Sequence, residues 1–247
     1  MTAGREGHLC PLWPQLLVRR FERGSPGRHP EIGSWLRTRG CQDVLVKHLS
    51  AAELEAGLSY VRDSPPDGGA VVLIARRPAV DEREVLTEAT LDVEAGLAGD
   101  TWPMRASSRT ADGSPHPGMQ VTMMNSRAAL LIAHDLDRRV LAGDQLYADL
   151  DLSPANLPPG ARLAVGSAVL EVTDQPHLGC AKFAARFGQD ALRFVNSRVG
   201  RELRLRGLNA RVVVSGTVRT GDAILKCAGL PGNLGEASVR PARVAGL

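Results

Sequence analysis

The sequence is poor in aromatic residues, which make up 4% of its 247 positions. Its hydrophobic core must therefore consist mainly of valine, leucine, isoleucine and alanine. The hydrophobic content of 43% and the charged content of 23% are ordinary for a globular protein. The chain is long enough to bury a sizeable core, as one large all-β domain or as two small ones.

Cysteine is also scarce, and its four positions are widely scattered. They are Cys10, Cys41, Cys180 and Cys227. No C-x-x-C occurs and no pair of histidines has ligand spacing, so nothing indicates a disulfide framework or a structural zinc site. We therefore expect a reduced, cytoplasmic protein.

Strong charge and long apolar runs are lacking as well. A net charge of +3 gives no electrostatic case for a nucleic-acid partner. No apolar run approaches the roughly 20 residues that span a membrane, and Leu12–Val18 is too short for a secretory signal. A Gly-rich phosphate loop is missing too, so there is no nucleotide cofactor motif.

Glycine and proline are plentiful, at 26 and 16 residues, and favour a turn-rich β architecture. We expect an irregular extension over 1–40, a helical segment and linker over 41–69, a β domain over 70–227 and a flexible tail over 228–247. A helix is predicted over Leu49–Val61, where Ser50 and Glu53 are spaced as a capping box and Leu49 and Leu54 as a hydrophobic staple.

Within the β domain, short apolar or alternating runs are separated by turn residues. They predict strands at 70–76, 84–88, 120–124, 146–152, 161–165, 168–172, 210–218 and 223–226. We expect a helix after Asn125 through His134, two short helices at 181–187 and 189–196, and a long loop at 103–118. The pattern predicts a mainly β fold with a few short helices, a barrel or a sandwich.

The segment from Thr173 to Gly188 is the most chemically directed part of the chain. It follows a predicted strand and enters a predicted helix, which places Cys180 at the helix start. Unpaired N–H groups and partial positive charge at a helix N-terminus favour a thiolate over a thiol. Lys182 and Arg186 are four residues apart, so they add positive charge on one helix face.

Other interpretations of these residues stay open. Cys180 is equally typical of a small buried residue, and His177 with Cys180 has the H-x-x-C spacing of a metal-ligand or Cys–His pair. The basic run from Arg198 to Arg211 is either a solvated face or, with Lys182 and Arg186, a phosphate pocket. Asn156 and Asn209 are either turn formers or amides that contact a ligand, and Asp100 and Asp222 are expected in turns.

Several short motifs together resemble the MOSC family, the domain related to the C-terminal part of molybdenum cofactor sulfurases. They are Gly96-Leu-Ala-Gly-Asp100, Leu152-Ser-Pro-Ala-Asn-Leu-Pro-Pro-Gly160, Gly166-Ser-Ala-Val-Leu-Glu-Val172, Gln175-Pro-His-Leu-Gly-Cys-Ala-Lys-Phe-Ala-Ala-Arg-Phe-Gly188 and Gly221-Asp222. The resemblance covers about 70–227 and implies a β-barrel with one essential cysteine, Cys180.

The resemblance also implies a molybdenum-pterin cofactor. Cys180 is then the catalytic residue and the molybdenum ligand or persulfide carrier, while Lys182 and Arg186 hold the cofactor phosphate. The full set of candidate cofactor-binding residues is Lys182, Arg186, His177, Asn156, Asn209 and Arg211.

Three functions follow as alternatives. The first is a molybdenum-dependent oxidoreductase that reduces N-hydroxylated or N-oxygenated small molecules with electrons from a separate reductase. The second is a sulfur-carrier or cofactor-binding protein without turnover, supplied by a sulfur donor protein. The third is a β-barrel interaction module in which Cys180 belongs to the core. The sequence leaves a homodimer open.

Overall fold

The computed structural model describes residues 47–227. The predictions for residues 1–40 and 228–247 lie outside the described residues. The helices are α1 (Ala51–Ala56), α2 (Leu58–Arg62), α3 (Ser126–Ala133), α4 (Ala181–Asn196) and α5 (Arg198–Glu202), with 3₁₀ turns η1 (Trp102–Met104), η2 (Pro117–Met119) and η3 (Arg139–Ala142). The strands are β1 (Gly69–Arg76), β2 (Glu84–Leu86), β3 (Glu88–Asp92), β4 (Gly96–Leu97), β5 (Val121–Asn125), β6 (Leu146–Asp149), β7 (Arg162–Val165), β8 (Ala168–Val172), β9 (Leu208–Val214), β10 (Gly216–Arg219) and β11 (Ala223–Lys226).

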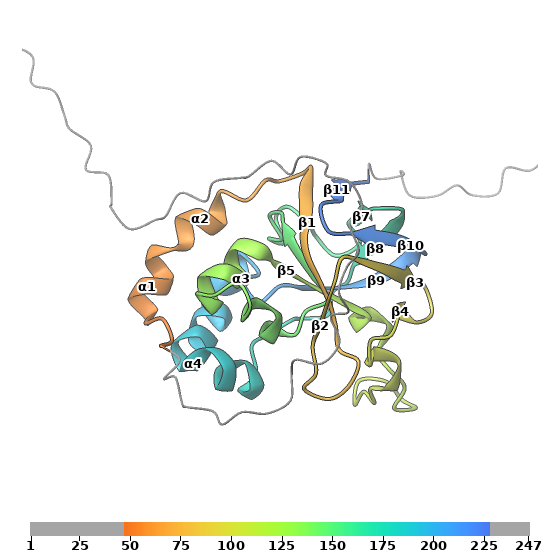
Figure 1. Cartoon of the computed structure of the whole chain (residues 1–247), viewed down its shortest axis with the longest axis horizontal. Helices are drawn as coiled ribbons and strands as arrows, with labels where there is room; N and C mark the ends of the chain where they lie inside the picture. The colour runs from red at the N-terminus through yellow and green to blue at the C-terminus, as the bar shows by residue number, and fades with distance from the viewer. Residues whose placement is uncertain (1–46, 228–247) are drawn as a thin grey trace, which may run out of the picture. The chain divides into compact units, whose positions relative to one another are not determined.

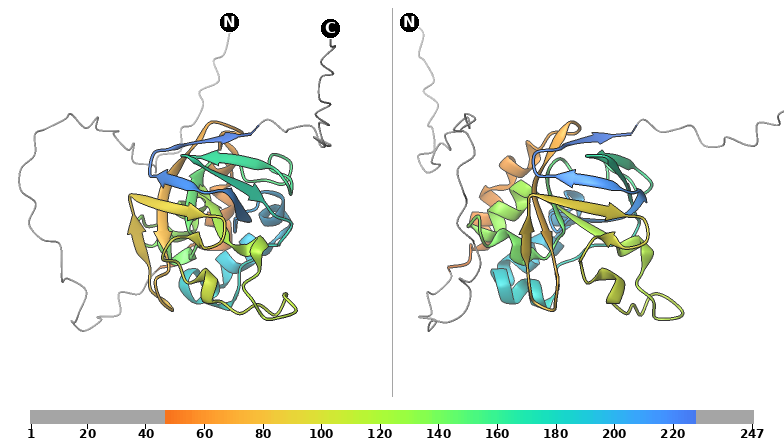
Figure 2. Two further views of the ribbon diagram at one scale, coloured as in Figure 1. Left: turned by 90° about the vertical axis from the view of Figure 1, so that its right-hand side faces the viewer. Right: turned by 45° about the vertical axis from the view of Figure 1, so that its right-hand side comes forward.

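Seven of these strands form a closed barrel. Their order is β1-β6-β5-β9-β8-β7-β11, and β11 pairs back onto β1. In Figure 2 the blue end of the chain accordingly returns beside the orange strand β1. All pairings in the ring are antiparallel except β5 with β6, which is parallel. Strand β2 extends the sheet beside β1, and β10, β3 and β4 form a second sheet. The expected mainly β, barrel-type fold is confirmed.

Two cores arise because the barrel strands bury alternating side chains on both faces. Met123 and Leu146 belong to the first core, which the ring of strands surrounds. Their immediate neighbours Met124 and Tyr147 point the other way and join the second core with α1, α3 and α4. Figure 1 shows these helices gathered on one side of the strands.

The predicted capping of the first helix is present. The Ser50 hydroxyl accepts from the Glu53 N–H, and the Glu53 carboxylate accepts from the Ser50 N–H. The helix predicted over Leu49–Val61 is nevertheless two helices, α1 and α2, joined at Gly57. A Cβ on Gly57 would lie 2.3 Å from a methyl carbon of Leu131, so glycine permits the close approach to α3.

Several boundaries differ from the prediction. The run 210–218 is two strands, because Ser215 separates β9 from β10 and the Ser215 hydroxyl accepts from the Val93 N–H across the second sheet. The run 84–88 is likewise shared between β2 and β3, and β6 ends at Asp149 instead of Leu152. The two short helices after Cys180 form α4, whose backbone breaks at Gly188 with φ 90°. The break lies where the sequence predicts it.

Among the described residues, no helix is both long enough and apolar enough to cross a membrane.

Candidate functional site

Cys180 is the N-cap residue of α4 and its side chain is exposed. The interpretation of Cys180 as a core residue is therefore wrong. The loop before it is held in two places. Asn196, the last residue of α4, exchanges two hydrogen bonds with the Gly179 backbone, at 2.9 and 3.0 Å. Asn209 on β9 donates its side-chain N–H groups to the carbonyls of Gln175 and Pro176.

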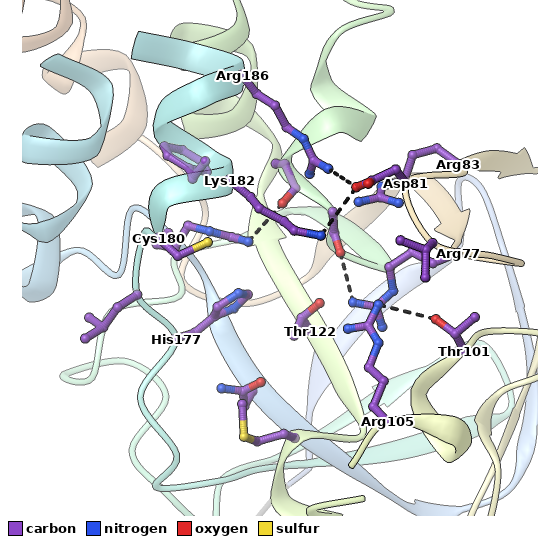
Figure 3. Close-up of a pocket in the computed structure, with 18 of the residues that line it drawn as sticks. Arg77, Asp81, Arg83, Thr101, Arg105, Thr122, His177, Cys180, Lys182 and Arg186 are labelled. Atoms are coloured by element: carbon purple, nitrogen blue, oxygen red, sulfur yellow. Dashed lines mark hydrogen bonds and ion pairs between the residues drawn. The ribbon is translucent and has the colours of Figure 1, made fainter. Parts of the chain in front are cut away.

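Cys180 lines a pocket of about 520 Å³. The pocket lies between the start of α4 and residues at or next to the ends of β1, β5 and β9. Six basic side chains line this pocket: Arg77, Arg83, Arg105, Lys182, Arg186 and Arg206. Figure 3 shows most of them directed from opposite walls toward the space in front of the cysteine. The pocket therefore combines one exposed sulfur with a concentration of positive charge.

Two of the six cations are neutralised by buried carboxylates. Arg77 forms a two-pronged pair with Asp100, at 2.7 and 2.8 Å, and Arg206 contacts Asp144 at 2.6 Å. Burial by itself would raise the pKa of Asp100, but the hydrogen bonds and charge of Arg77 outweigh it and lower that pKa. Asp100 also accepts from the backbone N–H groups of Arg77 and Trp102, so its predicted role in a turn is confirmed.

Two other cations, Arg83 and Arg105, form no close ion pair with a carboxylate among the described residues, although Asp81 and Asp100 lie near enough to attract them. Burial, and then the charges of Arg186 and Arg77, lower the pKa of Arg83. For Arg105 the causes are burial and the charges of Arg77 and Arg83. Like charges that lower one another's pKa values favour an anion between them. The electrostatics of the pocket therefore favour an anion over a cation.

His177 lies in the pocket wall with 13% of its side chain exposed. Burial, followed by the positive charge of Arg206, lowers its pKa to about 4, although Asp144 acts in the opposite direction. The ring is therefore neutral near pH 7. Its Nδ1 is buried and lies 3.6 Å from the Asp144 Oδ1.

The structure brings together most of the residues that the sequence singles out. Cys180, Lys182, Arg186, His177 and Asn209 all line the pocket. Asn156 and Arg211 do not. Asn156 donates to the carbonyls of Pro66 and Asp151 in a turn, and Arg211 pairs with Glu171 on the exposed face of β8 and β9. The geometry gives these two residues no place in the pocket.

The basic run 198–211 contributes one residue to the pocket, Arg206. Arg198 pairs with Glu202, Arg201 donates to the Asn196 carbonyl, and Arg204 donates to the carbonyls of Leu152 and Leu157. Most of this run therefore makes contacts away from the pocket, and Arg206 is the member that lines it.

Sequence reasoning missed the wall opposite Cys180. Arg77, Arg83 and Arg105 come from the end of β1, the start of β2 and the end of η1, up to about a hundred residues before the cysteine. Arg76, the neighbour of Arg77, ends β1 and pairs with Glu84 outside the pocket, so no local sequence signal marks Arg77 as a site residue. Within the described residues, no group of three or more His, Cys, Asp or Glu side chains has the arrangement of a metal site.

Comparison with known proteins fits this geometry. Residues 110–225 match the family model of the MOSC domain. The resemblance to this family that the sequence shows is therefore confirmed over these residues. MOSC domains are associated with the molybdenum cofactor. No protein of curated function matches the sequence.

Three solved structures resemble the chain at low identity. The YUAD protein from Bacillus subtilis is 19% identical, with 64% of this chain and 93% of that chain covered and a TM-score of 0.42. YiiM from Escherichia coli is 18% identical, with coverages of 65% and 71% and a TM-score of 0.43. YiiM from Geobacillus stearothermophilus is 13% identical, with coverages of 65% and 75% and a TM-score of 0.43.

Proposed function

We propose that the protein binds a molybdenum-pterin cofactor in this pocket and reduces N-hydroxylated or N-oxygenated small molecules. The observation that carries the proposal is the exposed Cys180 sulfur facing a pocket with six cationic side chains. A thiolate is a strong ligand for a high-valent metal, and guanidinium groups suit phosphate oxygens. The residues present therefore fit a cofactor that carries both a metal and a phosphate.

Each residue has a definite part in this proposal. Cys180 ligates molybdenum through its sulfur, and Lys182 and Arg186 bind the cofactor phosphate from the first two turns of α4. Arg83 and Arg105 add positive charge on the opposite wall, where Asp100 pairs with Arg77. Asn209 and Asn196 act on Cys180 indirectly, because they hold the loop that precedes it.

The bound cofactor supplies two-electron redox chemistry. Reduction of an N-hydroxyl group breaks the N–O bond, consumes two electrons and two protons, and releases an amine and water. The electrons come from a separate reductase protein. The two free cysteines of the described residues, Cys180 and Cys227, suit a reducing compartment, so we keep the cytoplasm as the proposed location.

Metal analysis of protein purified from a molybdenum-replete host tests the proposal. We expect molybdenum and pterin in the wild type and at least a roughly tenfold lower molybdenum content in Cys180→Ser. Cys227→Ser is the matched control, because Cys227 lies outside the pocket. A wild type without molybdenum, or equal loading of the two variants, contradicts the proposal.

The same exposed sulfur supports a second candidate, a sulfur carrier without turnover of its own. A persulfide on Cys180 would be open to a partner, because the side chain is exposed. Incubation with a cysteine desulfurase and cysteine, followed by mass spectrometry, distinguishes the two functions. One added sulfur that is lost in Cys180→Ser and kept in Cys227→Ser favours the carrier. An unmodified protein that turns over an N-hydroxylated substrate favours the reductase.

A further inference from the structure

The loop between β1 and β2 places a carboxylate in the cationic pocket. Asp81 Oδ1 lies 3.0 Å from Nη2 of Arg186 and 3.5 Å from Nζ of Lys182. Figure 3 shows both contacts, with Asp81 between the side chains that come down from α4. Lys182 and Arg186 are the two cations that the proposed function assigns to the cofactor phosphate. The Asp81 carboxylate therefore occupies the position that the phosphate would take.

The cations around Asp81 are positioned by other contacts. Arg186 donates from Nη1 to the Leu141 carbonyl at 2.8 Å, and this bond does not involve Asp81. A Cβ placed on Gly143 would lie 3.3 Å from Nη2 of Arg83 and 3.8 Å from Nη1 of Arg186, so the two guanidinium groups converge over this glycine. Arg77 donates to the Gly143 carbonyl from the same side. The positions of Arg83 and Arg186 thus do not rest on Asp81 alone, whereas the exposed Lys182 contacts Asp81 directly.

One carboxylate compensates this cluster incompletely. Asp81 carries a single negative charge, whereas Arg83, Lys182 and Arg186 around it carry three positive ones. A phosphate monoester near pH 7 carries nearly two negative charges and offers three acceptor oxygens. A phosphate therefore matches the cluster better than the carboxylate that lies there.

Asp81 is also held weakly. Its side chain is 62% exposed, and ion pairs at such exposure contribute little to stability. Its backbone has φ 61°, a left-handed conformation that aspartate adopts more readily than most residues. Because the ion pairs are exposed, the fold loses little stability when the side chain of Asp81 leaves the cations.

We propose that Asp81 is an internal competitor for the anion site formed by Lys182, Arg186 and Arg83, and that an anionic ligand binds by displacing it. The ligand class is a phosphate monoester or inorganic phosphate, which share the chemistry that the site recognises. The inference rests on the proposed function in one respect, that these cations bind an anion. It adds that Asp81 weakens this binding and so sets the concentration at which the site fills.

Titration with inorganic phosphate at fixed ionic strength tests the inference. Asp81→Asn removes the charge and keeps a residue that tolerates the left-handed conformation. We expect phosphate to bind about three- to tenfold more tightly to this variant than to the wild type. Glu82→Gln is the matched control, because it removes the same charge from the next position of the same exposed loop. We expect the control to change the affinity by less than about twofold.

Each result of the titration decides the inference. Equal tightening in Asp81→Asn and Glu82→Gln overturns it, since net charge alone would then explain the affinity. No tightening in Asp81→Asn also overturns it, because Asp81 would then not compete with phosphate. Failure of all three proteins to bind phosphate overturns it as well. The molybdenum content of the same preparations reports separately on the proposed function. Tighter phosphate binding by Asp81→Asn in proteins without molybdenum upholds the competitor and contradicts the cofactor.

Discussion

Buried charges are the residues on which the pocket depends most. The Arg77–Asp100 and Arg206–Asp144 pairs lie under its floor and walls, with side chains at most 10% exposed. Their positive charges are compensated by the protein, whereas those of Arg83 and Arg105 are not. The uncompensated positive charge of the pocket therefore includes that of Arg83 and Arg105.

His177 has an ordinary pKa near physiological pH, and the fold shifts this pKa strongly. Its pKa of about 4 in the folded protein is below the ordinary value of about 6.5, which it regains on unfolding. The neutral ring therefore stabilises the fold fully above about pH 6.5. This contribution falls as the pH decreases from about 6.5 to about 4, by up to about 3 kcal/mol in total.

Urea denaturation from about pH 7.5 to about pH 5 tests this dependence. We expect the wild type to lose about 2 kcal/mol more of its unfolding free energy over this range than His177→Gln, which has no titrating ring. Asp144 and Arg206 are present in both proteins, so their effects largely cancel. Parallel pH profiles of the two proteins contradict the expected shift.

Among the elements, α4 holds Cys180 in place through residues at both ends of the helix. Cys180 begins the helix, and Asn196 at its last position binds the Gly179 backbone in both directions. A Cβ on Gly179 would lie 2.8 Å from Val195 and 2.9 Å from Leu192, so the loop packs directly on the end of the helix. The break at Gly188 allows the helix to place its two ends on the same loop.

Removal of the Asn196 side chain is expected to loosen this loop. Asn196→Ala loses two hydrogen bonds, and we expect the unfolding free energy to fall by about 1–2 kcal/mol. Amide hydrogen exchange over residues 173–182 should accelerate by about tenfold, because the loop opens without global unfolding.

Asn156→Ala provides the control for this measurement. Its amide also bonds to backbone carbonyls, those of Pro66 and Asp151, but it lies outside the pocket. We expect unchanged exchange over residues 173–182 in this variant. Equal exchange in Asn196→Ala and the wild type would show that the two hydrogen bonds do not hold the loop.

Over the described part of the molecule, closure of the barrel determines where the site lies. Strand β11 pairs with β7 on one side and with β1 on the other, and so joins the two ends of the domain. Ile224 on this strand is 0% exposed and belongs to the barrel core, whereas its neighbour Leu225 is 50% exposed.

The alternation along β11 gives a matched pair of variants. We expect Ile224→Ala to lower the unfolding free energy by about 2–5 kcal/mol, because it leaves a cavity inside the barrel. Leu225→Ala should cost less than about 1 kcal/mol, because its side chain is half in water. Urea denaturation of both variants measures the difference. Similar losses would mean that β11 is not buried on one face as the barrel requires.

Much of the local structure could be predicted from the sequence. The caps at Ser50 and Asn125, the break at Gly188 and the strands 168–172 and 223–226 all follow from residues a few positions apart. The start of α4 at Cys180 could likewise be predicted from nearby residues. Predictions failed where a neighbour in space decided the outcome. The run 210–218 reads as one strand, but its second half pairs with β3 in the other sheet.

The sequence by itself thus determined the secondary structure around Cys180 and the candidate helix cations, Lys182 and Arg186. It did so because hydrophobic periods, caps and helix-face spacings act over a few residues. Only the tertiary structure decided that Arg77, Arg83 and Arg105 face them, that Asp81 lies between them, and that Asn156 and Arg211 lie elsewhere. These residues come together because the barrel closes, and pairing between distant strands has no signature in any single short stretch of sequence.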